Sequence, residues 1–118
     1  MPIRVHVACD HQIIRRSLAA LLDSDESLDV IRTSPEGVRG LEAVRNTRAD
    51  VLVLAVPPHE DIAQHADWYR QAISDAGIVG FAVTDEQAEG YRTAGIEEII
   101  YSHNSTADLS QAIHRVAP

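Results

Sequence analysis

The residues best suited to chemistry in this chain follow its first and third apolar runs. Cys9-Asp10-His11 comes directly after Ile3–Ala8 and offers a thiol, a carboxylate and an imidazole. The third run, Val51–Ala55, ends in an alanine, whose methyl group is neither a nucleophile nor a metal ligand. One carboxylate with neighbouring carbonyls is a poor Mg²⁺ site, so Asp10 is interpreted as a loop acid that helps to begin the next helix.

Histidines and the single cysteine allow two further kinds of chemistry. His11, His59 and His103 are expected at the same edge as Cys9, which is compatible with a transition-metal or pH-sensing site. None of them has ligand spacing, so solvated loop histidines are the preferred interpretation. A cysteine near a helix start can be a redox sensor, but at a strand end it is more often a small buried hydrophobic residue. We expect no metal and no cofactor.

Alternating strands and helices must position these groups. Apolar runs predict strands, and i, i+3, i+4 apolar spacing predicts a helix after each of them. Ser34-Pro35-Glu36 is predicted to begin the second helix, and Ala76-Gly77 to end the third. Thr84-Asp85-Glu86 begins a short fourth helix that stops by Ala94-Gly95, and Ser105 or Thr106 caps the last. The predicted strands are Ile3–Ala8, Leu28–Ile31, Val51–Ala55, Ile78–Val83 and Ile96–Tyr101.

This order of elements predicts an α/β fold. Strict β-α alternation implies right-handed crossovers and helices on both faces of a parallel sheet. Five units are too few for a (β/α)₈ barrel of about 250 residues, so the sheet should be open. The all-apolar run Val51–Ala55 is typical of a strand that is covered on both faces, and ligands of such sheets bind beyond the strand carboxyl ends.

Composition limits the classes of function. The chain has 118 residues, enough for one domain, and carries ten basic residues, all arginine, against eighteen acidic ones. The formal charge of −8 has the wrong sign for gripping nucleic acid directly. No apolar run approaches the roughly 20 residues that span a bilayer, and no secretory signal opens the sequence. One cysteine excludes an internal disulfide and fits a reducing compartment. Together these observations lead us to expect a cytoplasmic protein with no membrane partner.

The sequence from Ile3 to Leu22, including Cys9-Asp10-His11, resembles the opening of a bacterial response-regulator receiver domain of the NarL/FixJ type. The resemblance continues through Arg48–Leu54, Ala94-Gly95 and the segment from Ser105 to Val116. It implies a flavodoxin-like (βα)₅ three-layer sandwich with strand order 2-1-3-4-5. It also implies that residues 1–118 are one receiver-like regulatory domain, at the N-terminal end of a longer regulator.

The chemistry of that family is phosphoryl transfer to an aspartate, and the resemblance places each part on this sequence. The acidic pair that holds Mg²⁺ corresponds to Cys9-Asp10, and the phosphoacceptor corresponds to Ala55. The Ser/Thr that senses the phosphoryl group corresponds to Ala82 or, after a slip of two residues, to Thr84. The conserved lysine of the family corresponds to Ser102, and the chain has no lysine. The resemblance therefore implies a degenerate receiver without catalytic residues, because the metal and the positioned charges act together.

Two functions remain open. The first is a phosphorylation-independent receiver, not an enzyme, that controls dimerisation and activity of an attached helix-turn-helix transcription factor. Its partners would be a second copy or a related regulator, with DNA bound only through a separate C-terminal domain. The alternative is a small-molecule-sensing module, in which Ala55, Ala82 and Ser102 line the vacated pocket and an effector binds there.

Overall fold

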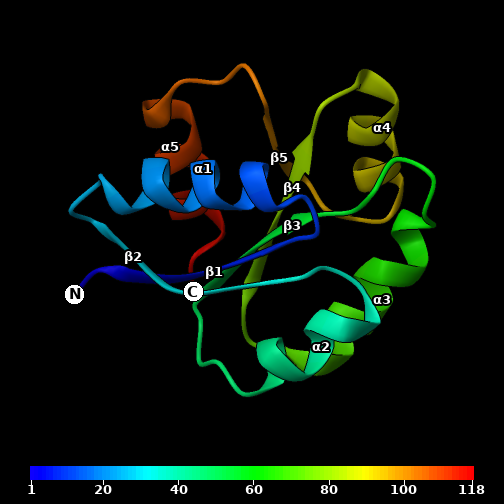
Figure 1. The fold of residues 1–118 in the computed structure, drawn as a ribbon, viewed down its shortest axis with the longest axis horizontal. Helices are drawn as coiled ribbons and strands as arrows, with labels where there is room; N and C mark the ends of the chain where they lie inside the picture. Colours follow the sequence, from blue (N-terminus) through cyan, green and yellow to red (C-terminus); the bar gives the residue numbers. More distant parts are fainter.

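Five strands and five helices alternate along the computed structural model, which describes all 118 residues. The strands form one parallel sheet in the order β2-β1-β3-β4-β5 (Figure 1). This confirms the predicted flavodoxin-like (βα)₅ fold. The elements are β1 (Ile3–Cys9), α1 (Gln12–Asp23), β2 (Leu28–Ser34), α2 (Val38–Arg45), β3 (Val51–Ala55), α3 (Ile62–Ala72), β4 (Gly77–Ala82), α4 (Asp85–Thr93), β5 (Glu98–Tyr101) and α5 (Thr106–Val116).

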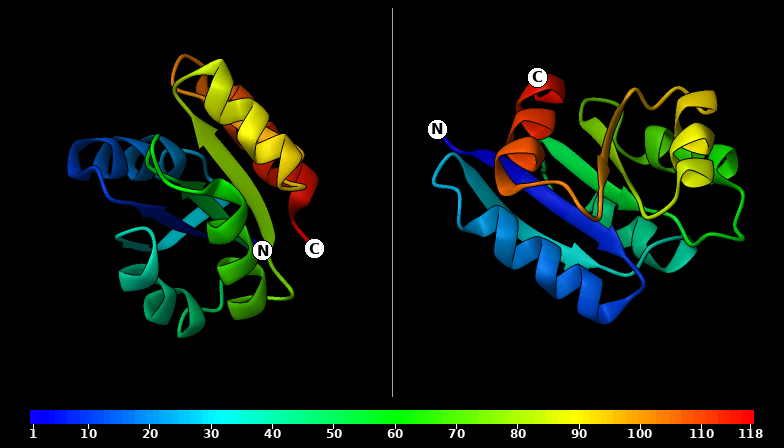
Figure 2. Two further views of the ribbon diagram at one scale, coloured as in Figure 1. Left: turned by 90° about the vertical axis from the view of Figure 1, so that its right-hand side faces the viewer. Right: turned by 90° about the horizontal axis from the view of Figure 1, so that it is seen from above.

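Helices cover both faces of the sheet, so the core has two parts (Figure 2). Alternate residues of each strand point to opposite faces. Val53 of β3 belongs to the cluster under α1 and α5, whereas its neighbours Leu52 and Leu54 belong to the cluster under α2, α3 and α4. All three are fully buried, which confirms β3 as a strand covered on both faces.

Two predicted helix boundaries are wrong. Ser34 does not begin a helix but ends β2, where it pairs with Ala8 of β1 and its buried hydroxyl lies 2.8 Å from His6 Nε2. Helix α2 begins only at Val38, after Gly37 with a φ of 83°. Helix α3 ends at Ala72, and Gly77 begins β4 instead of ending that helix. Ladder hydrogen bonds and burial outweigh the capping signals at these positions.

The other helix signals are confirmed. Thr84 and Ser105 each complete a capping box, at the start of α4 and of α5 respectively. Gly95, with a φ of 86°, follows the end of α4. Strand β5 begins at Glu98, two residues later than predicted. Every helix is too short or too polar to cross a membrane.

Candidate functional site at the carboxyl edge of the sheet

A cavity of about 530 Å³ opens where β1, β3 and β4 end. Cys9 and Ala55 are direct neighbours in the β1–β3 ladder, and both line this cavity. Its other apolar side chains come from the loop after β3, from α1 and from the end of β4. These are Ile14, Val56, Pro57, Pro58, Phe81 and Val83. The remaining lining is polar: Asp10, His11, His59, Glu60 and Gln87.

The cavity brings together some of the predicted site residues but not others. Cys9, Asp10, His11 and Ala55 line it, whereas Ala82, Thr84 and Ser102 do not. Ala82 packs in the cluster under α4, and Thr84 caps that helix. Ser102 is exposed, and its amide donates to the carbonyl of Ala82 at 3.1 Å. The prediction that Ala82 and Ser102 line the pocket is therefore wrong, whereas Ala55 does line it.

Phe81 and Val83 occupy the β4 side of the cavity in place of the two candidates from the sequence. The strand alternation could have identified them, because Phe81 belongs to the same sheet face as Cys9 and Ala55. Phe81 is 7% exposed, so its ring closes the inner part of the cavity, while Val83 is exposed near the mouth. The β4 wall of this site is thus apolar.

Asp10 is held by the loop after β2 and by the first turn of α2. Its Oδ1 atom accepts a hydrogen bond from the Glu36 amide at 2.9 Å and lies 3.4 Å from the Arg39 guanidinium. The residue that caps α1 is His11, whose Nδ1 accepts from the Ile14 amide at 3.4 Å. The interpretation of Asp10 as the acid that begins α1 is therefore wrong.

Cys9 is a packing residue in the structure. It is 3% exposed, and its thiol donates to the His11 carbonyl at 3.6 Å. Burial raises the pKa of the thiol, which keeps it protonated and poorly nucleophilic. The nearby Arg15 guanidinium donates to the Cys9 carbonyl at 2.9 Å. The local chemistry is that of a small hydrophobic residue.

Histidines do not form a metal centre here. His11, His59 and His103 are all exposed, and His103 stacks on Tyr101 with ring centroids 5.4 Å apart. No group of three or more His, Cys, Asp or Glu side chains is arranged to hold a metal ion.

Gln87 and Tyr91 of α4 fix the cavity walls, and the sequence analysis missed both roles. The side-chain oxygen of Gln87 accepts from the Val83 amide at 2.9 Å, and its nitrogen donates to the Val56 carbonyl at 3.4 Å. The Tyr91 hydroxyl accepts from the Val56 amide at 2.9 Å and donates toward the Leu54 and Phe81 carbonyls. The only sequence signal for these two roles was the presence of a Gln and a Tyr with apolar neighbours in a short predicted helix.

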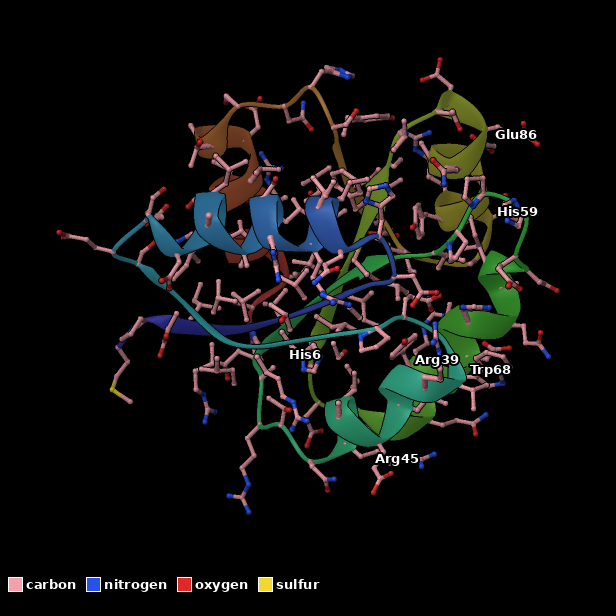
Figure 3. All side chains as sticks on the ribbon, viewed as in Figure 1. His6, Arg39, Arg45, His59, Trp68 and Glu86 are labelled. Carbon is pink, nitrogen blue, oxygen red and sulfur yellow. The ribbon has the colours of Figure 1, made fainter.

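A buried polar pair, Glu36 and His65, lies beside Asp10. His65 Nδ1 and Glu36 Oε2 are 2.6 Å apart, and both residues are buried. Burial raises the pKa of Glu36, and the hydrogen bond from His65 opposes that rise. The Tyr69 hydroxyl accepts from the Gly37 amide at 2.8 Å, so α3 holds the loop after β2. Trp68 stacks on His65 and lies near Arg39 on this side of the molecule (Figure 3).

Comparison with known proteins gives consistent neighbours. No family model matches the chain. The Response regulator protein VraR from Staphylococcus saprophyticus is 21% identical over 118 residues, which cover 98% of this chain and 56% of that protein. The chain therefore spans little more than half the length of this relative.

Solved structures agree with the sequence match. A two-component response regulator of the LuxR family from Aurantimonas sp. superposes with a TM-score of 0.81 at 22% identity, covering 98% of this chain and 84% of that one. A DNA-binding response regulator of the LuxR family from Staphylococcus aureus gives 0.79 at 11% identity, covering 96% and 97%. These three neighbours are response regulators, two of them of the LuxR family, and this chain shares the fold of the two solved structures.

Proposed function

We propose that residues 1–118 form a receiver-like regulatory domain whose signalling does not depend on phosphorylation. The observation that carries this proposal is Ala55 at the carboxyl end of β3, beside Cys9 in the ladder. A phosphorylatable receiver would need a carboxylate at the position of Ala55 and an acidic ligand for Mg²⁺ at the position of Cys9.

The surroundings of Ala55 support the same conclusion. Phosphoryl transfer relies on positive groups that stabilise the developing charge. No arginine or lysine lines the cavity, and Asp10 already accepts hydrogen bonds from Glu36 in the loop after β2 and from Arg39 of α2. Nothing in the lining replaces the metal, the lysine or the acceptor, so we infer that the domain is not an enzyme.

The fixed walls favour a single conformation. Gln87 and Tyr91 join the ends of β3 and β4 to α4, and Pro57-Pro58 restrict the loop that follows β3. A receiver that cannot be switched at this site would be controlled by association. The partner would be a second copy of this chain or a related regulator, with which the domain forms a dimer.

The output is proposed from the neighbours. One of the similar structures is a DNA-binding response regulator, and the chain spans 56% of the length of its curated relative. These neighbours support the proposal that a helix-turn-helix DNA-binding domain follows this one in a cytoplasmic transcription regulator. The charge of −8 makes direct DNA contact by residues 1–118 unfavourable.

The solution mass of the purified domain tests this proposal. Light scattering should give the same mass with and without Mg²⁺ and acetyl phosphate, and intact mass spectrometry should show no added phosphoryl group. A phosphorylatable receiver treated in parallel verifies that the donor is active. A phosphoryl adduct, or association that requires the donor, would refute phosphorylation independence.

A second candidate function is small-molecule sensing, which the apolar cavity of about 530 Å³ favours. Binding pockets of drug-sized ligands typically have volumes in this range. Ligand at a hundred times its Kd stabilises the folded state by about 2.7 kcal/mol, so a thermal-shift screen detects it. The absence of any shift across a broad metabolite panel would exclude this candidate.

A further inference from the structure

The charge of the carboxyl-edge cavity restricts what can bind there. Its thirteen lining residues include the carboxylates of Asp10 and Glu60 but no lysine or arginine. The closest guanidinium groups are already used, since Arg15 donates to the Cys9 carbonyl and Arg39 pairs with Asp10. A ligand with a carboxylate or phosphate would face two like charges and no lysine or arginine in the lining.

The inner part of the cavity is apolar. Cys9 and Phe81 are 3% and 7% exposed, and the methyl group of Ala55 leaves open the space that a larger side chain would fill. Ile14 and Pro57 add further apolar surface to the lining. Burying apolar ligand surface here gains about 25 cal/mol per Å². The inner end therefore suits a ring or a branched aliphatic group.

The polar lining residues come from the loop after β1, the loop after β3 and helix α4. Asp10 uses Oδ1 for its hydrogen bonds with Glu36 in the loop after β2 and with Arg39 of α2, and its Oδ2 makes no protein hydrogen bond. Glu60 is exposed and lines the same cavity, as do the rings of His11 and His59. Each neutral imidazole can donate from one ring nitrogen and accept at the other, whereas the two carboxylates accept hydrogen bonds and attract positive charge. A ligand with an apolar body would thus place a donor or a cation toward them.

The walls exist before any ligand binds. Tyr91 and Gln87 hold the backbone of Val56, and Gln87 also holds Val83 on the opposite side. A ligand does not have to order these segments, so little binding free energy is lost to conformational entropy. The shape of the cavity in this structure is therefore a useful guide to its ligand.

We propose that this cavity binds a small molecule with an apolar, ring-sized body and a neutral or cationic polar end, and that it discriminates against carboxylates and phosphates. This inference rests on the second candidate function, the small-molecule sensor. It goes further in fixing the chemical class: an aryl-alkylamine or an aryl-alkyl alcohol fits, whereas the phosphoryl group and its anionic analogues do not.

Three probes with one aromatic body test the class. 2-Phenylethylamine, 2-phenylethanol and phenylacetate differ mainly in the charge of the polar end. Titration followed by ¹H–¹⁵N chemical shifts should show the amine and the alcohol perturbing the cavity residues. Phenylacetate should bind at least about tenfold more weakly than the amine, a difference of about 1.4 kcal/mol.

Two variants locate the site. Ala55→Leu fills the inner end and should abolish the shifts caused by the amine, while Ala107→Leu, at an exposed position of α5, should leave them unchanged. Glu60→Gln removes an exposed charge and should reduce the preference for amine over acid without affecting the alcohol. The last variant keeps the proposal testable if Ala55→Leu does not fold.

The outcomes separate the proposals. Failure of both the amine and the alcohol to bind, or equal binding of phenylacetate, overturns this inference. Binding of phenylacetate alone overturns it but leaves the small-molecule candidate intact. Phosphorylation independence is decided separately by the mass measurements with acetyl phosphate.

Discussion

Single buried hydroxyls and rings help to determine the shape of the carboxyl edge even where they do not line the cavity. Tyr91 is fully buried, and Gly80 lies so close to its ring that an added Cβ would be 2.6 Å from Cγ. The ring therefore has one position, from which the hydroxyl reaches the ends of both β3 and β4. Tyr91 positions the cavity wall without touching the cavity.

Removing this hydroxyl should be costly. Tyr91→Phe keeps the ring but leaves the buried Val56 amide without its acceptor, a loss of about 1–3 kcal/mol. Tyr101→Phe is the matched control, because its hydroxyl makes only an exposed contact with Arg92, and it should cost below about 0.5 kcal/mol. Urea unfolding measures both values. Equal effects of the two substitutions would contradict the role given to Tyr91.

His6 should make stability depend on pH. It is 1% exposed, and burial, assisted by Arg32, lowers its pKa from 6.5 to about 4 (Figure 3). Because the folded state holds the ring neutral, the contribution of His6 to the free energy of unfolding is complete above pH 6.5 and is lost as the pH falls toward 4. The full loss is about 3 kcal/mol.

The variant His6→Gln isolates this effect from the titration of the acidic residues. The free energy of unfolding of the wild type should fall more steeply than that of the variant between pH 6.5 and 4. Parallel curves for the two proteins would show that His6 does not titrate in this range.

Secondary-structure elements show where sequence prediction succeeds and fails. The start of α4 at Thr84 was predictable because a cap is a local interaction within four residues. The end of β2 was not, because Ser34 is held by the distant His6 and by the β1 ladder. Likewise the positions of Cys9, Asp10 and Ala55 followed from strand ends, whereas the Glu36–His65 pair joins residues 29 apart in sequence. Long-range contacts between side chains leave no periodic signal.

The cap on α4 gives a prediction at this scale. Thr84→Ala should destabilise the protein by about 1 kcal/mol, because the Gln87 amide loses its acceptor, whereas Thr84→Ser should retain the bond. Thr93→Ala removes an exposed hydroxyl from the last turn of the same helix and should change stability by less than about 0.5 kcal/mol. Thermal unfolding followed by circular dichroism compares the three. Equal losses at positions 84 and 93 would mean that the cap contributes nothing.

The whole molecule should unfold as one unit. Strands β1, β3 and β4 contribute side chains to both core clusters, so neither cluster can melt without exposing the other. Trp68 is the only tryptophan and reports on α3, on one side of the sheet, while circular dichroism reports on all helices. Their urea transitions should coincide, with a slope of about 1–3 kcal/mol per molar. Separate midpoints would show that the two layers are independent.

The buried thiol of Cys9 can serve as a kinetic probe of this architecture. It is the only sulfhydryl in the chain, and it lies at the inner end of the cavity with 3% of its surface exposed. An alkylating reagent reaches Sγ only while the connection between β1 and α1 is locally unfolded. When reclosing is faster than alkylation, the rate at which iodoacetamide labels the native protein reports the population of the open state. A ligand that occupies the cavity would lengthen the labelling half-life by a factor of one plus the ratio of the free ligand concentration to Kd, because only the unliganded protein is labelled.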